Sequence, residues 1–296
     1  MNTLLNEITT LLDAAGLPGS AAEAGRILDA GRAGLATTLP LTDAAALSER
    51  VLSMARRRAQ GEPLAYVTGR ELFMGIELIA DAGALVPREE TELLGHTALA
   101  LLGACGTAAP RVIDMCCGSG NLACALATRF PAARIWASDL TDGCVSLARR
   151  NVAHTGVADR VAVAQGDLFA GLVGLVGLEL EGTADLIVCN PPYISQGRLA
   201  GDRAPLLEHE PREAFVGGPY GLSIHQRVIR EALPYLREGG TLMFEIGLGQ
   251  DRQLKRLFDR ARGYGSLLAV PNAAGEVRVV AGRKESKMAS ASITGI

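Results

Sequence analysis

The residues Asn190, Pro191, Pro192 and Tyr193 form a short polar and aromatic segment that follows an apolar run at residues 184–189. The side-chain amide of Asn190 offers a carbonyl acceptor and an NH2 donor group. The two prolines supply no backbone N–H and stiffen the chain, and Tyr193 adds a flat aromatic face. These groups can form a slot for a planar, nitrogen-bearing group with acceptors directed at its hydrogens; the alternative is a proline-rich turn that only ends a strand.

A second candidate site lies at residues 112–121, where an apolar run passes into a glycine turn and then into an expected helix. Gly118 and Gly120 allow the backbone to turn tightly and to approach a ligand closely. The helix expected to begin at Asn121 would direct the positive end of its dipole at this turn. The pattern therefore suits a nucleotide or a carboxylate.

Two aspartates follow the next two expected strands. Asp139 ends the first of these strands, where a carboxylate can accept hydrogen bonds from both hydroxyls of a ribose. This pattern alone does not separate NAD from S-adenosylmethionine, but the complete Gly-x-Gly-x-x-Gly fingerprint is absent, which disfavours NAD. Asp167, with Leu168, follows the second strand and can bond an adenine amino group; the alternative is a turn or cap residue.

Helical and strand patterns alternate from residue 92 onward, and this alternation must position the polar residues. Helical patterns occupy residues 91–102, 121–129, 142–154, 223–236 and 251–261, and strand patterns occupy residues 111–115, 133–138, 161–165, 186–189, 241–246, 267–270 and 277–281. Such alternation predicts an α/β fold with a doubly wound, Rossmann-like, mostly parallel sheet.

The rest of the chain predicts a small helical domain and a connection. Residues 1–60 show apolar side chains at helical spacing, with Thr42 and Asp43 as the cap of a third helix. Residues 61–90 have strand character at 65–69 and 73–79 and suggest a linking hairpin. Residues 91–283 then form the main domain, and residues 284–296 are expected to be a frayed tail.

Composition narrows the class of protein. The net charge of −3 and the lack of a long basic stripe argue against nonspecific nucleic-acid binding. The six cysteines form no Cys-x-x-Cys pair and are expected to be buried thiols in a reducing compartment, and the four histidines show no metal-ligand spacing. Neither a secretory signal nor an apolar stretch long enough to span a membrane is apparent, so we expect a cytoplasmic protein.

The order of these motifs resembles that of class I S-adenosylmethionine-dependent methyltransferases. Further segments resemble the HemK family, the glutamine methyltransferases that modify peptide-chain release factors, over about residues 60–283. They are Gly61-Glu62-Pro63-Leu64-Ala65-Tyr66, Gly69-Arg70-Glu71-Leu72-Phe73, Val86-Pro87-Arg88-Glu89-Glu90-Thr91-Glu92, Glu210-Pro211, Gly217-Gly218, Gly221-Leu222, Glu245-Ile246-Gly247 and Val277-Arg278-Val279-Val280.

The resemblance implies a donor, an acceptor and a set of site residues. The donor is S-adenosylmethionine, with a binding site at Asp114, Cys116, Gly118, Gly120, Asn121, Asp139, Leu140, Asp167, Leu168 and Asn190. The partner is a release factor, whose glutamine amide donates to Asn190 and to the carbonyl of Pro191 while Tyr193 packs on the amide plane. Pro192, Arg88 and Thr91 are expected to contact this substrate.

Departures from the family pattern leave other acceptors open. Cys116-Cys117 stands where a small residue and then Thr are usual, Glu89 replaces a usual Pro, and Ser223 replaces a common Asp. One alternative is a specialised-metabolism enzyme that methylates a small amine or amide. Another is a cyclase that converts S-adenosylmethionine itself into azetidine-2-carboxylate and methylthioadenosine. Methylation of DNA or RNA, and cofactor binding without catalysis, are weaker alternatives.

Overall fold

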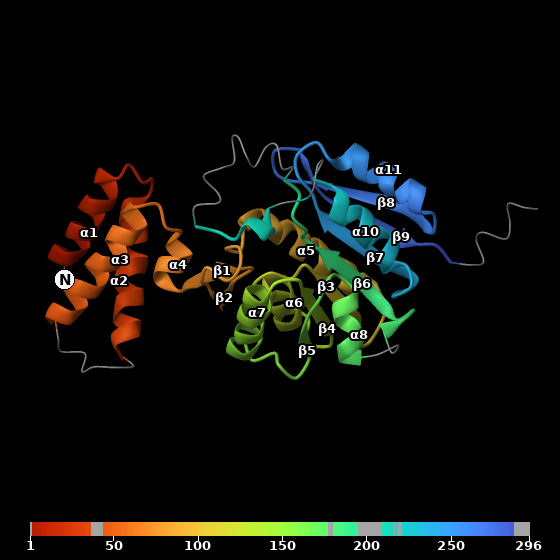
Figure 1. Cartoon of the computed structure of the whole chain (residues 1–296), viewed down its shortest axis with the longest axis horizontal. Coiled ribbons are helices and arrows are strands. Elements are labelled where there is room, and N and C mark those ends of the chain that lie inside the picture. The colour runs from red at the N-terminus through yellow and green to blue at the C-terminus, as the bar shows by residue number, and fades with distance from the viewer. Residues whose placement is uncertain are drawn as a thin grey trace, which may run out of the picture. The chain divides into compact units, whose positions relative to one another are not determined.

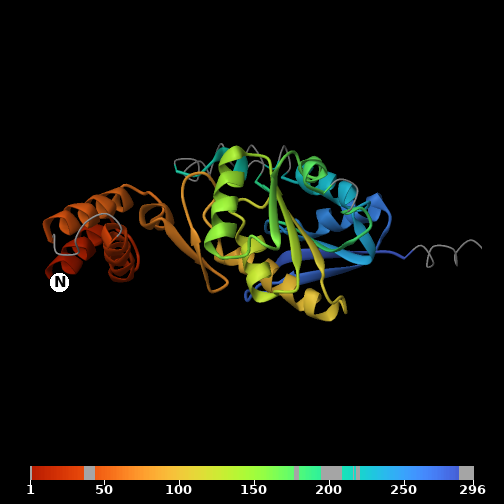
Figure 2. The same cartoon turned by 90° about the horizontal axis from the view of Figure 1, so that it is seen from below.

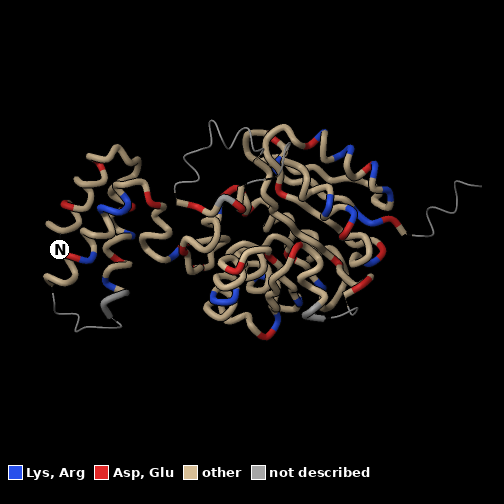
Figure 3. The backbone as a smooth tube through the Cα atoms, in the orientation of Figure 1, with Lys and Arg blue, Asp and Glu red and all other residues tan. Residues whose placement is uncertain are grey.

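The computed structural model describes residues 2–36, 44–176, 180–194, 209–215, 217 and 221–286 (Figure 1). The chain divides into two compact units, Met1–Glu71 with Ile79–Ala82, and Leu72–Leu78 with Gly83–Ile296. The border between the units thus falls within the region that the sequence suggested as a connection. Basic and acidic residues are interspersed along the described parts of both units (Figure 3).

The first unit is helical. It contains α1 (Asn2–Ala14), α2 (Ser20–Ala36), α3 (Ala44–Ala59) and the short α4 (Leu64–Thr68). The apolar residues at helical spacing form its core, in which Ile8, Leu12, Ile27 and Val51 are fully buried. The predicted cap at residues 42 and 43 lies outside the described residues.

The expected strand at residues 65–69 is wrong, because α4 occupies this segment. Pro63 precedes the helix, and Gly69 ends it with a left-handed φ of 73°. These residues favour a single helical turn, in which the buried Val67 joins the core of the first unit. The stretch at 73–79 is also not one strand: Met74 and Gly75, with φ of 49° and 74°, turn between β1 (Arg70–Phe73) and β2 (Ile76–Ile79).

The second unit contains a seven-stranded sheet with the order β5-β4-β3-β6-β7-β9-β8. Its strands are β3 (Arg111–Met115), β4 (Arg134–Asp139), β5 (Val161–Gln165), β6 (Ala184–Cys189), β7 (Leu236–Glu245), β8 (Tyr264–Pro271) and β9 (Val277–Lys284). Pairing is parallel from β5 to β7 and antiparallel where β9 joins β7 and β8. The predicted doubly wound α/β fold is confirmed.

Helices cover both faces of this sheet (Figure 2). One face packs on α5 (Glu89–Ala104), α6 (Asn121–Arg129) and α7 (Asp142–His154) through a core that includes Val112. The other face packs on α8 (Ala170–Val176), α10 (Ser223–Ala232) and α11 (Asp251–Ala261) through a core that includes Ile113. Consecutive residues of β3 thus serve opposite faces, as the pleat requires.

Two helices differ from the sequence expectation. The sequence patterns did not predict α8, and α10 ends at Ala232 instead of residue 236. Pro234 explains the early end, because proline has no N–H with which to continue the helical hydrogen bonds. Among the helices of the described ranges, none combines the length and the apolarity needed to cross a bilayer.

Candidate active site

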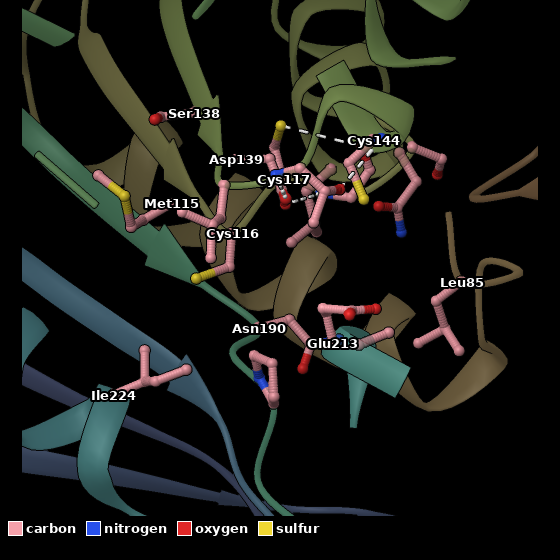
Figure 4. A pocket seen from close by; sticks show the side chains of 18 of the residues that line it. Leu85, Met115, Cys116, Cys117, Ser138, Asp139, Cys144, Asn190, Glu213 and Ile224 are labelled. Carbon is pink, nitrogen blue, oxygen red and sulfur yellow. Dashed lines mark hydrogen bonds between the residues drawn. The ribbon is translucent and has the colours of Figure 1, made fainter. Parts of the chain in front are cut away.

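A cavity of about 350 Å³ opens in the second unit where β3, β4, β5 and β6 end (Figure 4). The sheet order reverses between β3 and β6, and open α/β sheets bind ligands at such a switch point. The volume suits a small-molecule site. Eleven of the predicted residues line it: Arg88, Thr91, Cys116, Gly118, Asn121, Asp139, Leu140, Asp167, Leu168, Asn190 and Pro192.

Four predicted residues, Asp114, Gly120, Pro191 and Tyr193, do not line this cavity. Asp114 is fully buried below the glycine turn, where its Oδ2 accepts a hydrogen bond of 3.0 Å from the backbone N–H of Ala123. Its Oδ1 has no hydrogen-bond partner among the described residues. Burial is the main reason that the pKa of this carboxyl rises to about 7. Asp114 thus supports the turn and the start of α6.

The glycine turn is held in an unusual backbone conformation. Cys116, Gly118 and Gly120 have left-handed φ values of 58°, 54° and 76°. A Cβ on Gly120 would lie 3.1 Å from the Cβ of Ala148, so the close packing of the turn on α7 requires glycine there. The N-cap residue Gly120 has no side chain to cap this helix, and Asp114 accepts from the Ala123 amide in its first turn, so the amides of Asn121 and Leu122 are the ones left for a ligand.

Asp139 connects this turn to the end of β4. Its Oδ2 accepts a hydrogen bond of 2.9 Å from the Gly118 amide, and its Oδ1 accepts one of 3.2 Å from the Thr141 amide. Each oxygen retains a lone pair for a ligand hydroxyl. The neighbouring Leu140 lines the cavity with 60% of its surface exposed, which suits an apolar ring system.

Asp167 has a partner that sequence reasoning missed. Arg227 of α10 donates from one guanidinium nitrogen to both of its carboxylate oxygens, at 2.9 and 3.0 Å. Arg227 also lines the cavity. Sixty residues separate the two, so no local pattern could have revealed the pair.

The orientation of Asn190 follows from a chain of hydrogen bonds. Its Nδ2 donates to Thr91 Oγ1 at 3.1 Å, and Thr91 in turn donates to Glu245 Oε2 at 2.6 Å. Because one N–H of Asn190 is bonded to Thr91, the orientation of the amide is fixed and Oδ1 is the acceptor that it can offer to a ligand. Thr91 thus lies between the predicted catalytic amide and a carboxylate.

Glu245 also holds Tyr193, the last residue of the Asn190–Tyr193 segment. The hydroxyl of Tyr193 donates to Glu245 Oε1 at 3.2 Å, and Arg278 lies 3.5 Å from the same oxygen. Only 2% of Glu245 is exposed, and burial raises the pKa of its carboxyl. Burial, followed by the nearby Glu245 charge, likewise raises the pKa of Tyr193. The tyrosine is therefore a neutral donor at physiological pH.

The cavity lining also contains the charged residues Arg88 and Glu213. Arg88 forms an ion pair with the buried Glu210, which also accepts from the backbone of Val86 at 3.2 Å. Glu213 also lines the cavity (Figure 4), and sequence reasoning did not select it. Glu213 belongs to η3 (Arg212–Ala214), a short element with no apolar periodicity that could have revealed it.

The cysteines are free thiols, and four of the six are buried. Cys116, Cys117 and Cys144 line the cavity. Burial raises the pKa of Cys144 to about 12 and that of Cys117 well above its usual range, so neither is a thiolate nucleophile. Within the described ranges, no three His, Cys, Asp or Glu side chains gather as metal ligands.

A doubly wound sheet with a glycine turn after β3, an acidic residue at the end of β4 and Asn-Pro-Pro-Tyr after β6 defines a class I S-adenosylmethionine-dependent methyltransferase. Residues 96–205 match the family model of the methyltransferase small domain. The release factor glutamine methyltransferase of Moorella thermoacetica is 36% identical over 75% of each chain, and that of Streptomyces coelicolor is 32% identical over 96% of this chain and 99% of its own. The chain belongs to the HemK family of methyltransferases.

Two further similarities concern the acceptor and the fold. The 4-amino-L-phenylalanine/4-methylamino-L-phenylalanine methyltransferase of Streptomyces pristinaespiralis is 37% identical over 88% of this chain and 87% of its own. Among solved structures, the catalytic domain of hMettl16 in complex with the MAT2A 3'UTR hairpin 6 has a TM-score of 0.56, at 17% identity over 81% of this chain and 82% of that one. The second similarity shows the fold alone.

Proposed function

We propose that the protein transfers a methyl group from S-adenosylmethionine to the side-chain nitrogen of a glutamine in a peptide-chain release factor. The observation that carries this proposal is the orientation of Asn190, whose Nδ2 is bonded to Thr91 so that Oδ1 is left to accept an N–H. The relatives from Moorella thermoacetica and Streptomyces coelicolor, both named for release factor glutamine methylation, support the acceptor.

The residues at the cavity fit S-adenosylmethionine. Asp139 is fixed with free lone pairs for the ribose, and Leu140 and Leu168 offer apolar surface to the adenine. The turn at Cys116 and Gly118, and the start of α6 at Asn121, suit the amino-acid part. When bound, S-adenosylmethionine supplies an electrophilic methyl group on a positively charged sulfur.

The protein's own residues act chiefly by positioning. An amide nitrogen is a poor nucleophile because its lone pair is delocalised into the carbonyl. Acceptors at Asn190 Oδ1 and at the carbonyl of Pro191 would hold both N–H groups of the substrate, orient the lone pair and favour positive charge on nitrogen. The methylated nitrogen is acidic and can then lose its proton to water, so this mechanism requires no strong base at the site.

Incubation with a release factor and methyl-labelled S-adenosylmethionine tests the acceptor. We expect one label per release factor, located on a glutamine side chain by peptide mapping, and no label on a release factor in which that glutamine is replaced by alanine. If the folded protein binds S-adenosylhomocysteine yet transfers no label, the release factor is not the acceptor.

A second candidate acceptor is the aromatic amine of a free amino acid. The Streptomyces pristinaespiralis relative matches most of both chains, and Glu213 places a carboxylate in the cavity that could pair with an α-ammonium group. Label on 4-amino-L-phenylalanine, but not on release factor, would favour it. Cyclisation of the cofactor has no support from these relatives, and methylthioadenosine formed without any acceptor would be its signature.

A further inference from the structure

We propose that Glu245 and Thr91 are positioning residues that fix and polarise Asn190, so that one buried carboxylate sets the acceptor strength of the catalytic amide. This inference rests on the proposed role of Asn190 in binding the substrate nitrogen, but not on the identity of the substrate.

The hydrogen bonds from Asn190 through Thr91 to Glu245 can run in one direction only. Glu245 Oε2 is an acceptor, so the Thr91 hydroxyl proton points to it across 2.6 Å. The Thr91 oxygen must then accept from Asn190, across 3.1 Å, and the amide is held with its NH2 toward α5. The chain from a carboxylate through a hydroxyl to an amide leaves only one orientation in which every hydrogen bond is made.

The same chain changes the electronic character of the amide. Hydrogen bonds in series polarise one another, and a carboxylate at the end strengthens the effect. Donation from Nδ2 shifts electron density toward Oδ1, which makes it a better acceptor for an N–H that gains positive charge. The contribution of Glu245 should therefore appear where the bound group is cationic.

Charged groups around Glu245 support this role. Arg278, 3.5 Å away, is 13% exposed and offsets the buried negative charge, and Tyr193 donates to the other oxygen. Glu90 of α5 is a nearby like charge. Glu245 thus interacts with one cation, Arg278, and with two hydroxyl donors, Thr91 and Tyr193. These contacts fix the positions of Asn190 and Tyr193 relative to each other.

The test uses sinefungin, an analogue of the cofactor with a cationic amine at the place of the transferable methyl, and S-adenosylhomocysteine, which has no group there. Calorimetry gives both dissociation constants for the wild type and for Thr91→Val, Thr91→Ser and Glu245→Gln. Thr97→Val is the matched control, because Thr97 lies on the same helix and its hydroxyl, as far as the described residues show, bonds only to the carbonyl of Leu93 in that helix.

We expect Thr91→Val to weaken sinefungin about tenfold, the size of one charge-assisted hydrogen bond, and to leave S-adenosylhomocysteine within about twofold. The preference of the protein is the ratio of its affinity for sinefungin to its affinity for S-adenosylhomocysteine. Thr91→Ser should restore the wild-type ratio, and Glu245→Gln should lower this ratio. An unchanged ratio in folded Thr91→Val and Glu245→Gln would overturn the inference; if Thr91→Val does not fold, Glu245→Gln decides alone. Because no acceptor is used, a failure to methylate release factor leaves this result intact.

Discussion

Asp139 and Gly118 are joined by a hydrogen bond of 2.9 Å between a carboxylate oxygen and a backbone amide, which links the end of β4 to the glycine turn after β3. The bond fixes the carboxylate at the cavity wall and holds the turn in its left-handed conformation. Asp139 thus shapes the turn and keeps lone pairs on the side of the cavity, where we propose that the ribose binds.

Replacement of Asp139 by alanine should therefore weaken the binding of S-adenosylhomocysteine by at least about tenfold, since two ribose hydrogen bonds to a charged group would be lost. Calorimetry measures the dissociation constant. Asp142→Ala is the control, because Asp142 lies in the first turn of α7, outside the cavity lining. Equal affinities for the two variants would show that Asp139 does not bind the ribose.

The buried Asp114 predicts a pH dependence of stability. Its folded pKa is raised from 3.8 to about 7, so the folded state binds the proton more tightly than the unfolded state. The stabilisation that the folded state gains from this proton is complete below about pH 4 and is lost as the pH rises through 7.

As the pH rises from 5 to 8, the wild type loses the contribution of Asp114 and Asp114→Asn does not. We therefore expect the free energy of unfolding of Asp114→Asn to rise relative to that of the wild type across this range, on the order of 2–4 kcal/mol. The asparagine retains an acceptor for the Ala123 amide. Urea denaturation at both pH values measures the difference, and parallel pH profiles for the two proteins would contradict the assignment of Asp114 as the titrating group.

Gly120 should tolerate no side chain. Alanine there would combine an unfavourable φ of 76° with a contact of 3.1 Å to the Cβ of Ala148, and we expect a loss of about 2–3 kcal/mol in the free energy of unfolding. Gly156→Ala is the matched control, since Gly156 has a φ of 70° and open space around it; it should cost about 1 kcal/mol. Equal losses would show that packing against α7 adds nothing.

The central strands of the sheet could be predicted from the sequence because they are buried on both faces. Runs such as residues 161–165 and 184–189 are nearly continuous in apolar residues, and Asp167 and Asn190, which follow them, line the cavity. Parallel strands bring their carboxyl ends to one edge of the sheet, so Asp139, Asp167 and Asn190, which end or follow predicted strands, could be expected at that edge.

The partners of these residues could not be predicted in this way. Glu245 lies 154 residues from Thr91, and their contact depends on β7 and α5 meeting in the folded unit. The segment that became α4 shows a different limit, because the four hydrophobic residues between Pro63 and Gly69 suit either a strand or one helical turn. Tertiary packing decided that case.

Separate measurements of binding and turnover for Asn190→Ala test the central claim most directly. Asn190 lines the cavity beside the glycine turn, but its proposed work is on the acceptor nitrogen. The variant should bind S-adenosylhomocysteine within about threefold of the wild type and lose at least about a hundredfold in kcat, the cost of one donor or acceptor aimed at developing charge. An unchanged kcat, with labelled glutamine still formed, would contradict the account.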